Sequence, residues 1–543
     1  MKRIAYQFRA AISTARVGTG ALARPSRAHR GPRRARFWLD GVEKLGGYLC
    51  GWQLSILRNL LIAAVITSMI ALASPALAAT RPHYGGTLRV MLQSAPNALE
   101  LPLDATNATS SDYWDALRML SLIGDTLVKL DALDRPQPAL AAAWQSDPTA
   151  RHWQFTLRRG LKFHDGSAAT PAVIAQILGA LHSDWRVRGS ADLLTIESET
   201  AMPALLAELA LPRNLLLKRN ADGVPIGTGA FLVTEWQPGK LLKLAANEES
   251  WAGRPFVDAV EIEFGKSLRD QAIALELNKT DLIEAPPQAA TGSQRHGASS
   301  SSSPSPSSSS SLSLPVELLA LVFSPNSKAQ DPRLREALAL AIDRKPIQSV
   351  LLKGAGEPAA TILPNWMTGY STVFSAPANP QRARASLADA PPLLLKSSYA
   401  LSYDPRDPQA QLIAERIALN AREVGITLQV TLSGAEDLRL VRVVLPSPDP
   451  ATSLAEAARQ LGLPHPPFSM DLNLEDLYRA ERELLDDHGV IPLFHLPVAS
   501  AAGVRVRGWE PDRLAEWDGA WPALPDIWLA DARTDSPPQA GPR

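Results

Sequence analysis

Residues 60–73 form an uncharged apolar run, LLIAAVITSMIALA, that determines the compartment in which the rest of the chain has to fold. A basic residue precedes the run and the small-residue stretch SPALAA follows it, which are the parts of a secretory signal peptide. Its fourteen residues are fewer than the roughly 20 that a membrane-spanning helix needs. The sequence therefore favours a cleaved signal over a membrane anchor, with cleavage expected after Ala78 or Ala79.

Positive charge is concentrated before this run. The first 58 residues hold twelve Lys or Arg and only two acidic residues, Asp40 and Glu43. The whole chain has 55 basic and 55 acidic residues, so the remainder is acidic. A nucleic-acid-binding protein carries its positive charge on the folded domain, and the sequence excludes that class. The basic leader is longer than an ordinary signal, so either translation starts further in or the leader is atypical.

Cys50 is the only cysteine of the chain, and it lies before the apolar run. A single cysteine excludes a disulfide framework and a cysteine-rich zinc site. A lipid-anchored cysteine would follow the apolar run, so no lipid anchor is expected. The mature chain is predicted to be exported and free of cysteine.

Strands and helices alternate along the mature chain, which indicates an α/β protein. A helix begins at Thr170-Pro171, because threonine caps a helix well and proline suits its first position. Residues 299–313 contain twelve serines and are predicted to form a flexible loop or linker, since such a tract has nothing to bury. The other expected strands are 87–92, 153–157, 161–163, 230–235, 241–245, 257–264 and 426–432, and the other expected helices are 334–342 and 409–424.

The sequence contains no Gly-x-Ser-x-Gly elbow, P-loop, His-Glu-x-x-His or dinucleotide-binding glycine fingerprint. Residues 227–229 (GTG) superficially resemble half of a nucleotide loop, but a tight turn is the favoured interpretation. His164-Asp165 is interpreted as a turn, because adjacent strand residues point to opposite faces and do not form a catalytic pair. Residues 486–488 (DDH) are interpreted as a solvent-exposed helix end. The sequence therefore predicts no catalytic residue, no metal site and no cofactor.

Nine segments in a fixed order resemble family 5 extracellular solute-binding proteins, the periplasmic receptors of oligopeptide, dipeptide and nickel ABC importers. They run from about residue 84 to residue 529. Each segment is modestly specific, and their order makes the resemblance strong. The segments are YGGTLRV, WQFTLRRGLKFHDG with ATP after it, PIGTGAFLVTEWQPGKLLKL, SWAGRPFVDAVEIEF, DPRLREALALAIDRK, LLKGAGEPAATILP, LSYDPRDPQAQLIAERIALNAREVGITLQV, VIPLFHL and PDIWL.

The resemblance implies an α/β, bilobed periplasmic-binding-protein fold of type II, a clamshell with a small accessory domain. A hinge closes such lobes around the ligand. The implied division is a basic leader plus signal peptide at 1–79, lobe I at 80–115, the accessory domain at 116–219, lobe I again at 220–315 and ending in the Ser-rich loop 299–313, lobe II at 316–494, and lobe I with the tail at 495–543.

The resemblance also implies a function. We expect a periplasmic substrate-binding protein of an ABC importer that captures peptides or another small polar solute and delivers them to an inner-membrane permease. It is expected to be a monomer, to bind no nucleic acid and not to be an enzyme. The alternative is a non-transport solute receptor or sensor on the same fold. A secreted hydrolase is disfavoured, because no nucleophile–base pattern is present.

One segment departs from the family. The family typically pairs the amino group of a peptide with an aspartate in a second-lobe segment resembling ADYPDP. Here residues 445–450 read LPSPDP, and Pro446 stands at the position of that aspartate. Proline offers neither a carboxylate nor a backbone donor. Either peptide recognition is altered, or Asp437 or Asp449 takes the role. The stretch from Pro450 to Ile491 is also shorter than in the family.

The resemblance nominates seven cleft residues, with core packing or solvent exposure as the alternative for each. Two follow the first strand, two precede the accessory domain, two lie in the second lobe and one precedes the altered segment. The aromatic residues could form walls of the cleft, and the arginine could pair with a ligand carboxylate. The seven are Gln93, Asn97, Tyr113, Trp114, Trp366, Tyr370 and Arg442.

Overall fold

The computed structural model describes residues 82–100, 110–131, 135–285, 308–325, 327–374, 377–407, 409–432, 436–464, 473–509 and 524–530. The predicted leader, the signal peptide and its cleavage site lie outside the described residues. Residues 81–543 form one compact unit. No helix among the described residues is both long enough and apolar enough to cross a bilayer.

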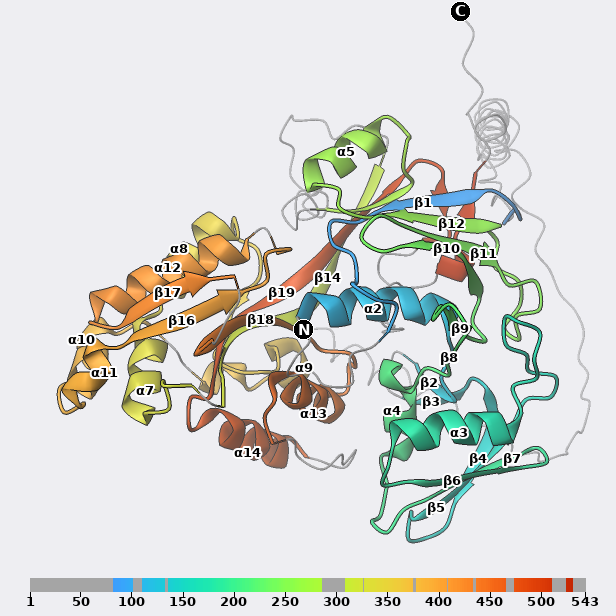
Figure 1. Ribbon diagram of the computed structural model, residues 1–543, viewed down its shortest axis with the longest axis horizontal. Helices are drawn as coiled ribbons and strands as arrows, with labels where there is room; N and C mark the ends of the chain where they lie inside the picture. The colour runs from blue at the N-terminus through green and yellow to red at the C-terminus, as the bar shows by residue number, and fades with distance from the viewer. Residues whose placement is uncertain are drawn as a thin grey trace, which may run out of the picture. The chain divides into compact units, whose positions relative to one another are not determined.

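A mixed sheet of 11 strands is the frame of this unit (Figure 1). We call the part on one side of the β19–β14 pair the first lobe and the part on the other side the second lobe. The strand order is β10 (Phe231–Gln237), β11 (Leu241–Ala246), β12 (Ala259–Glu263), β1 (Thr87–Met91), β13 (Leu282–Glu284), β19 (Val490–Gly503), β14 (Ser308–Phe323), β18 (Leu438–Val444), β16 (Ser398–Tyr403) and β17 (Thr427–Thr431), with β15 (Glu357–Pro358) paired to β19.

In the first lobe, β1 has a parallel partner on each side, β12 and β13. Its residues alternate between buried and more exposed positions, and Leu88 and Val90 lie in the core of the lobe. Apolar residues of helix α2 (Ser110–Ile123) join this core. The lobe also contains helix α5 (Leu268–Glu276), the pair β8 (Lys218–Arg219) and β9 (Pro225–Ile226), and the pair β20 (Val506–Arg507) and β21 (Trp528–Leu529).

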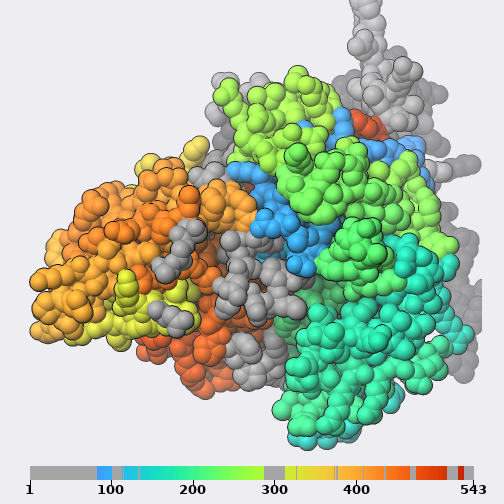
Figure 2. All heavy atoms as spheres, in the orientation of Figure 1, coloured from blue at the N-terminus to red at the C-terminus, as the bar shows by residue number. Residues whose placement is uncertain are grey.

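The accessory domain has its own four-stranded sheet and its own core. The first position of helix α3 is Pro171, and the side chain of Thr170 accepts a hydrogen bond from the amide of Val173, as the sequence predicts. In Figure 2 the atoms of this domain, in teal, lie against those of the first lobe, in green. Its elements are β2 (Val128–Leu130), β3 (Pro136–Pro138), β4 (Ala141–Ser146), β5 (His152–Leu157), α3 (Pro171–Leu181), β6 (Arg186–Ser190), β7 (Leu193–Glu197), α4 (Leu205–Ala210) and the 3₁₀ turn η1 (Pro212–Asn214).

The second lobe has a core on each face of its sheet. Alternate residues of β14 enter the two cores, with Leu319 and Leu321 on one face and Leu318 and Ala320 on the other. This alternation follows from the two-residue period of a strand. The helical elements of the lobe are α7 (Pro332–Ala341), α8 (Arg344–Pro346), η2 (Ile347–Leu351), α9 (Asn365–Thr368), η3 (Ser371–Val373), α10 (Pro380–Leu387), α11 (Pro392–Lys396), α12 (Ala410–Glu423), α13 (Pro450–Leu461) and α14 (Leu474–Leu485).

The antiparallel pair of β14 and β19 belongs to both lobes (Figure 1). Its pairing extends from Ser308 opposite Gly503 to Val322 opposite Val490. The register shifts on both sides of Pro315, which lies opposite Pro497. Proline has no amide hydrogen to donate to a ladder, so neither residue of this pair donates a backbone hydrogen bond.

Two predictions about local structure are wrong. Residues 161–163 do not form a strand; a single bridge joins Lys162 to Ala168. The Ser-rich loop predicted at 299–313 ends before residue 308, because the last serines already belong to β14. Their backbone groups pair with β19, and pairing of this kind needs no apolar side chain on the strand. The part from 299 to 307 lies outside the described residues, and the predicted lobe boundaries at 315 and 494 fall inside β14 and β19.

Candidate ligand-binding site

The two lobes contact each other through helix α2. Tyr113 and Leu117, both buried on α2, form an apolar cluster with Val444 at the end of β18. Val498 of β19 packs against the same cluster. The N-terminal half of α2 thus lies against the second lobe, while other residues of the helix enter the first-lobe core.

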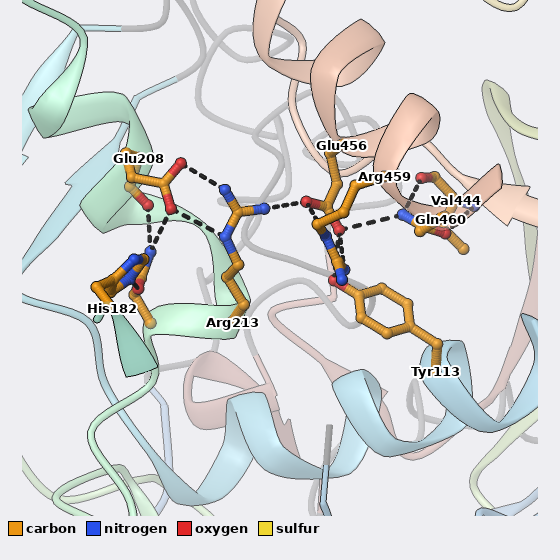
Figure 3. Close-up of polar contacts among 9 residues, drawn as sticks. Tyr113, His182, Glu208, Arg213, Val444, Glu456, Arg459 and Gln460 are labelled. Atoms are coloured by element: carbon orange, nitrogen blue, oxygen red, sulfur yellow. Dashed lines mark hydrogen bonds and ion pairs between the residues drawn. The ribbon is translucent and has the colours of Figure 1, made fainter. Parts of the chain in front are cut away.

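A chain of charged side chains continues this contact (Figure 3). In the accessory domain, Arg213 donates from Nε to Glu208 at 2.9 Å, and its Nη1 donates to Glu456 of α13 in the second lobe. The Tyr113 hydroxyl donates to the same Glu456 carboxylate at 3.1 Å. Within α13, Arg459 donates to both oxygens of Glu456, at 2.6 and 3.0 Å. The Glu456 carboxylate therefore accepts hydrogen bonds from the first lobe, from the accessory domain and from its own helix.

These neighbours keep Glu456 ionised although its side chain is only 1% exposed. Burial by itself favours the protonated form, but the guanidinium groups of Arg459 and Arg213 hold the pKa of Glu456 below its ordinary value. Burial and the nearby Glu456 charge raise the pKa of Tyr113, so its hydroxyl remains a donor. The site therefore contains an ionised carboxylate paired with two guanidinium groups and a tyrosine hydroxyl that stays protonated.

The larger of two cavities beside this network has a volume of about 1130 Å³. Helices α2, α3 and α4 and strand β8 contribute to its lining, and α13 contributes Ala455 and Arg459. The apolar side chains of the lining are those of Leu120, Ile177, Leu181, Trp185, Met202, Leu205, Leu215 and Leu217. The cavity thus combines an apolar wall with charged residues, some of them from the network and others outside it, such as Asp184, Lys218 and Arg219.

The smaller cavity, of about 510 Å³, contains the altered segment. Pro446, Ser447 and Pro448 of the second lobe line it together with residues of the first lobe and the accessory domain, such as Asp125 and Lys129. The segment aligned with the family's amine-binding motif therefore does face a cavity between the lobes. Pro446 brings no charge to this cavity.

The alternative amine anchors both have structural partners. Asp437 is buried and accepts hydrogen bonds from the amides of Lys328 and Ala400. Asp449 caps helix α13, because its carboxylate accepts from the amide of Thr452 at 2.7 Å. Neither residue is among those that line the two cavities.

The capping role of Asp449 predicts a measurable effect on stability. Asp449→Ala should lower the free energy of unfolding by about 1 kcal/mol, because the first turn of α13 loses its acceptor. Asp449→Asn keeps an acceptor oxygen and should cost only about a few tenths of a kcal/mol. Urea denaturation of the two variants checks this, and equal losses for both would contradict the capping role.

The structure brings few of the seven nominated residues together. Tyr113 lines the larger cavity and belongs to the ionic network. The backbone amide of Gln93 donates to Glu284 at 2.7 Å, and Asn97 is exposed. The side chain of Trp114 lies outside what the structure describes.

The remaining nominated residues contact other groups of the second lobe and of β14. Trp366 donates from its ring nitrogen to the carbonyl of Pro315 at 2.7 Å. Tyr370 donates to Glu481 at 2.8 Å and packs against Tyr478. Arg442 donates to the carboxylates of Glu317 and Asp407. These contacts account for the three residues without a ligand, and their role in binding stays a prediction.

Glu481, the partner of Tyr370, predicts a pH dependence of stability. Burial raises the pKa of Glu481 to about 7, from an ordinary value of 4.5. The folded state therefore binds this proton more tightly than the unfolded state, so stability falls as the pH rises from about 4.5 to about 7. This group alone should cost about 3 kcal/mol over that interval. Unfolding measured at pH 4.5 and 7.5 should show this loss for the wild type and a clearly smaller one for Glu481→Gln.

Sequence reasoning missed Glu208, Arg213, Glu456 and Arg459. Arg213 and Glu456 are 243 residues apart in the sequence. No local motif surrounds either residue, so only the folded chain shows that they meet. The sequence gives only an indirect indication of Glu456. The altered segment 445–450 leads into the helix that begins at Pro450, and Glu456 is the seventh residue of that helix.

The motifs considered for chemistry have structural roles. The ring of His164 interacts through Nε2 with the carbonyl of Gly229 at 3.1 Å, and the amide of Gly227 donates to Nδ1 of the same ring. Thr228 donates to Asp125 at 2.9 Å. The GTG turn and the His164 turn thus hold each other between the accessory domain and the first lobe. Among the described residues, no group of three or more His, Cys, Asp or Glu is placed to hold a metal ion.

Comparison with protein families gives a match over residues 135–440 to the model of bacterial extracellular solute-binding proteins, family 5 Middle. The nickel-binding protein NikA of Staphylococcus aureus is 21% identical over 366 residues, which cover 62% of this chain and 70% of that protein. The dipeptide-binding protein of Escherichia coli is 22% identical over 345 residues, which cover 54% of this chain and 62% of that protein. The chain thus spans less than two thirds of the latter relative.

Solved structures are similar over a larger part of the chain. The PBP AgaA of A. tumefaciens R10, in complex with agropinic acid, has a TM-score of 0.68 and 18% identity, covering 82% of this chain and 99% of that one. DppA of Helicobacter pylori, in complex with the peptide STSA, has a TM-score of 0.66 and 17% identity, with the same coverage. Together with the large mixed sheet, these likenesses confirm the predicted type II periplasmic-binding-protein fold.

Proposed function

We propose, from the premise that the chain belongs to the bacterial extracellular solute-binding proteins of family 5, that it captures a peptide or a similar small solute between its two lobes. It would then deliver this solute to an inner-membrane ABC permease. One observation carries the proposal. The contacts of Glu456 with Arg213 and Tyr113 join the second lobe to the rest of the unit beside a cavity that both parts line.

Physical chemistry supports capture by closure. A ligand that contacts both lobes favours the closed arrangement by the difference between its affinities for the two arrangements. The larger cavity has the size of a small-molecule site, and moving α13 would change its wall. The relatives are binding proteins by name, and we assign no catalytic residue to this chain.

The ligand class is narrowed by the altered segment. Pro446 removes the carboxylate that the family offers to a peptide amino group, and Asp437 and Asp449 are engaged elsewhere. We therefore infer that a peptide ligand, if taken, is held without that anchor. The protein is proposed to act in the periplasm as a monomer, after removal of the signal peptide.

A thermal-shift screen tests the proposal. Protein expressed from the full-length sequence is mixed with di- to hexapeptides, amino acids, sugars, opine-like compounds and nickel chelates. A ligand of the folded state should stabilise it by about 2.7 kcal/mol at one hundred times its dissociation constant. Cooperative unfolding without a shift for any compound would contradict solute capture. Mass spectrometry of the purified protein would show whether its chain begins at Ala79 or Thr80.

The second candidate function is a solute receptor that serves no importer. The short stretch from Pro450 to Ile491 favours it, because part of the second lobe is reduced. Uptake of the identified solute by cells with and without the gene separates the two. The import function requires that uptake be lost with the gene, whereas a receptor would leave uptake unchanged.

A further inference from the structure

The Glu456 carboxylate binds to two donors outside the second lobe, Tyr113 and Arg213, which together we call the receptor. Its two oxygens accept from the Tyr113 hydroxyl and from Nη1 of Arg213. Tyr113 belongs to α2 and Arg213 to the turn η1, so both donors come from outside the second lobe, and Tyr113 also packs against Val444 of β18. Two donors that converge on one carboxylate, one of them charged, are a strong arrangement for binding such a group.

The accessory domain holds this receptor in place. Glu208 accepts from Nε and Nη2 of Arg213, which fixes the plane of the guanidinium group and leaves Nη1 directed at Glu456 (Figure 3). The Asn214 amide donates to the same Glu208 at 3.2 Å, and Asn214 is itself 2.6 Å from a ring nitrogen of His182. The guanidinium group of Arg213 therefore has a partner within the accessory domain besides Glu456.

If a ligand carboxylate took the place of Glu456 at Tyr113 and Arg213, each buried charged side chain would still have a partner of opposite charge. If Glu456 withdraws with α13, it keeps Arg459, and the Gln460 amide also lies within hydrogen-bonding distance at 3.4 Å. Arg213 likewise keeps Glu208. The large penalty for an isolated buried ion does not arise, so a ligand carboxylate can compete with Glu456.

The cavity next to the receptor is mainly apolar. Tyr113 and Arg213 are part of its lining, as are Leu120, Ile177 and Met202. A carboxylate bound at the receptor would therefore place the body of its molecule against aliphatic and aromatic side chains. Burial of apolar surface then favours an apolar body.

We propose that the solute is an amphipathic carboxylate, that its carboxylate binds Tyr113 and Arg213, and that Glu456 is an internal competitor for this receptor. The proposal rests on the proposed function and names the ligand class of that site. It predicts that removing the charge of Glu456 strengthens binding, which is the opposite of the usual result of changing a site residue.

Isothermal titration with octanoate tests the proposal. Glu456→Gln should bind octanoate about tenfold more tightly than the wild type, because the charge-assisted bond of the competitor is lost. Arg213→Gln should weaken binding at least about thirtyfold and Tyr113→Phe about fivefold, by loss of the respective donor. Arg186→Gln, at an exposed ion pair of the same domain, is the control and should match the wild type.

The alcohol 1-octanol separates recognition of the carboxylate from burial of the chain. It should bind weakly, and Glu456→Gln should not change its affinity. Equal affinities of 1-octanol and octanoate, or no gain from Glu456→Gln, would overturn the proposal. If Glu456→Gln does not fold, the ratio of octanoate to 1-octanol affinity in Tyr113→Phe decides, and an unchanged ratio overturns the proposal.

Peptides measured in the same titration distinguish the two proposals. Peptide binding without octanoate binding would overturn the ligand class and leave solute capture intact. Absence of binding for both classes by a cooperatively folded protein would overturn the ligand class, and solute capture would be overturned as well only if no other compound of the thermal-shift screen binds.

Discussion

Replacing Arg442 with methionine is expected to lower the free energy of unfolding by about 3 to 5 kcal/mol, because the change leaves two largely buried carboxylates without their cation. Arg442 donates to Asp407 at 2.7 Å and to Glu317 at 3.0 Å. The side chains of these partners are only 13% and 9% exposed. Urea denaturation followed by circular dichroism measures the loss.

Arg479→Met is the control for this prediction, because Arg479 makes its ion pairs on the exposed face of α14. It should cost no more than about 1 kcal/mol. A similarly small loss for Arg442→Met would show that its ion pairs contribute little. Loss of solute binding at unchanged stability would instead support the ligand role that the sequence suggests for Arg442.

Gly227→Ala is expected to lower the free energy of unfolding by about 3 kcal/mol, because the new methyl group has no space. A Cβ atom at this position would lie 2.1 Å from the carbonyl oxygen of Ile123 and 2.8 Å from the Cα of Gly124. Both are backbone atoms, so a change of rotamer cannot relieve the contact. Thermal and urea unfolding of the variant check the prediction.

Gly179→Ala provides the matched control. Gly179 lies within α3, and a Cβ atom there meets no heavy atom within 4 Å. Since alanine is the better helix former, this variant should gain about 0.5 to 1 kcal/mol. If Gly227→Ala were as stable as the wild type, the close packing of the GTG turn against α2 would be wrong.

Local signals in the sequence predict much of the fold. The Thr170-Pro171 pair marks the start of α3, and alternation in residues 153–157 marks most of β5, because caps and strand periods depend on neighbouring residues alone. The same reasoning fails at residues 308–313. There the strand depends on backbone pairing with β19, a partner about 190 residues further along the chain.

The candidate site is less predictable than the fold. Among the nominated residues whose side chains the structure describes, Tyr113 is the one that lies in the ionic network. Arg213 and Glu456 lie in segments whose sequences suggest only helix and turn, and their pairing depends on how the accessory domain and α13 are packed. Residue types alone also do not separate a ligand-binding arginine from Arg442, whose partners are Asp407 and Glu317.

The shared strands β14 and β19 have a consequence for how the protein loses its structure. Their ladder is continuous with the strands of both lobes, so unfolding either lobe removes hydrogen-bond partners from the other. Amide deuterium exchange should then show the two lobes opening in a single cooperative event. Neither residue of the Pro315–Pro497 pair can donate an amide hydrogen to the ladder, so the amides next to it should exchange before those of the rest of the ladder.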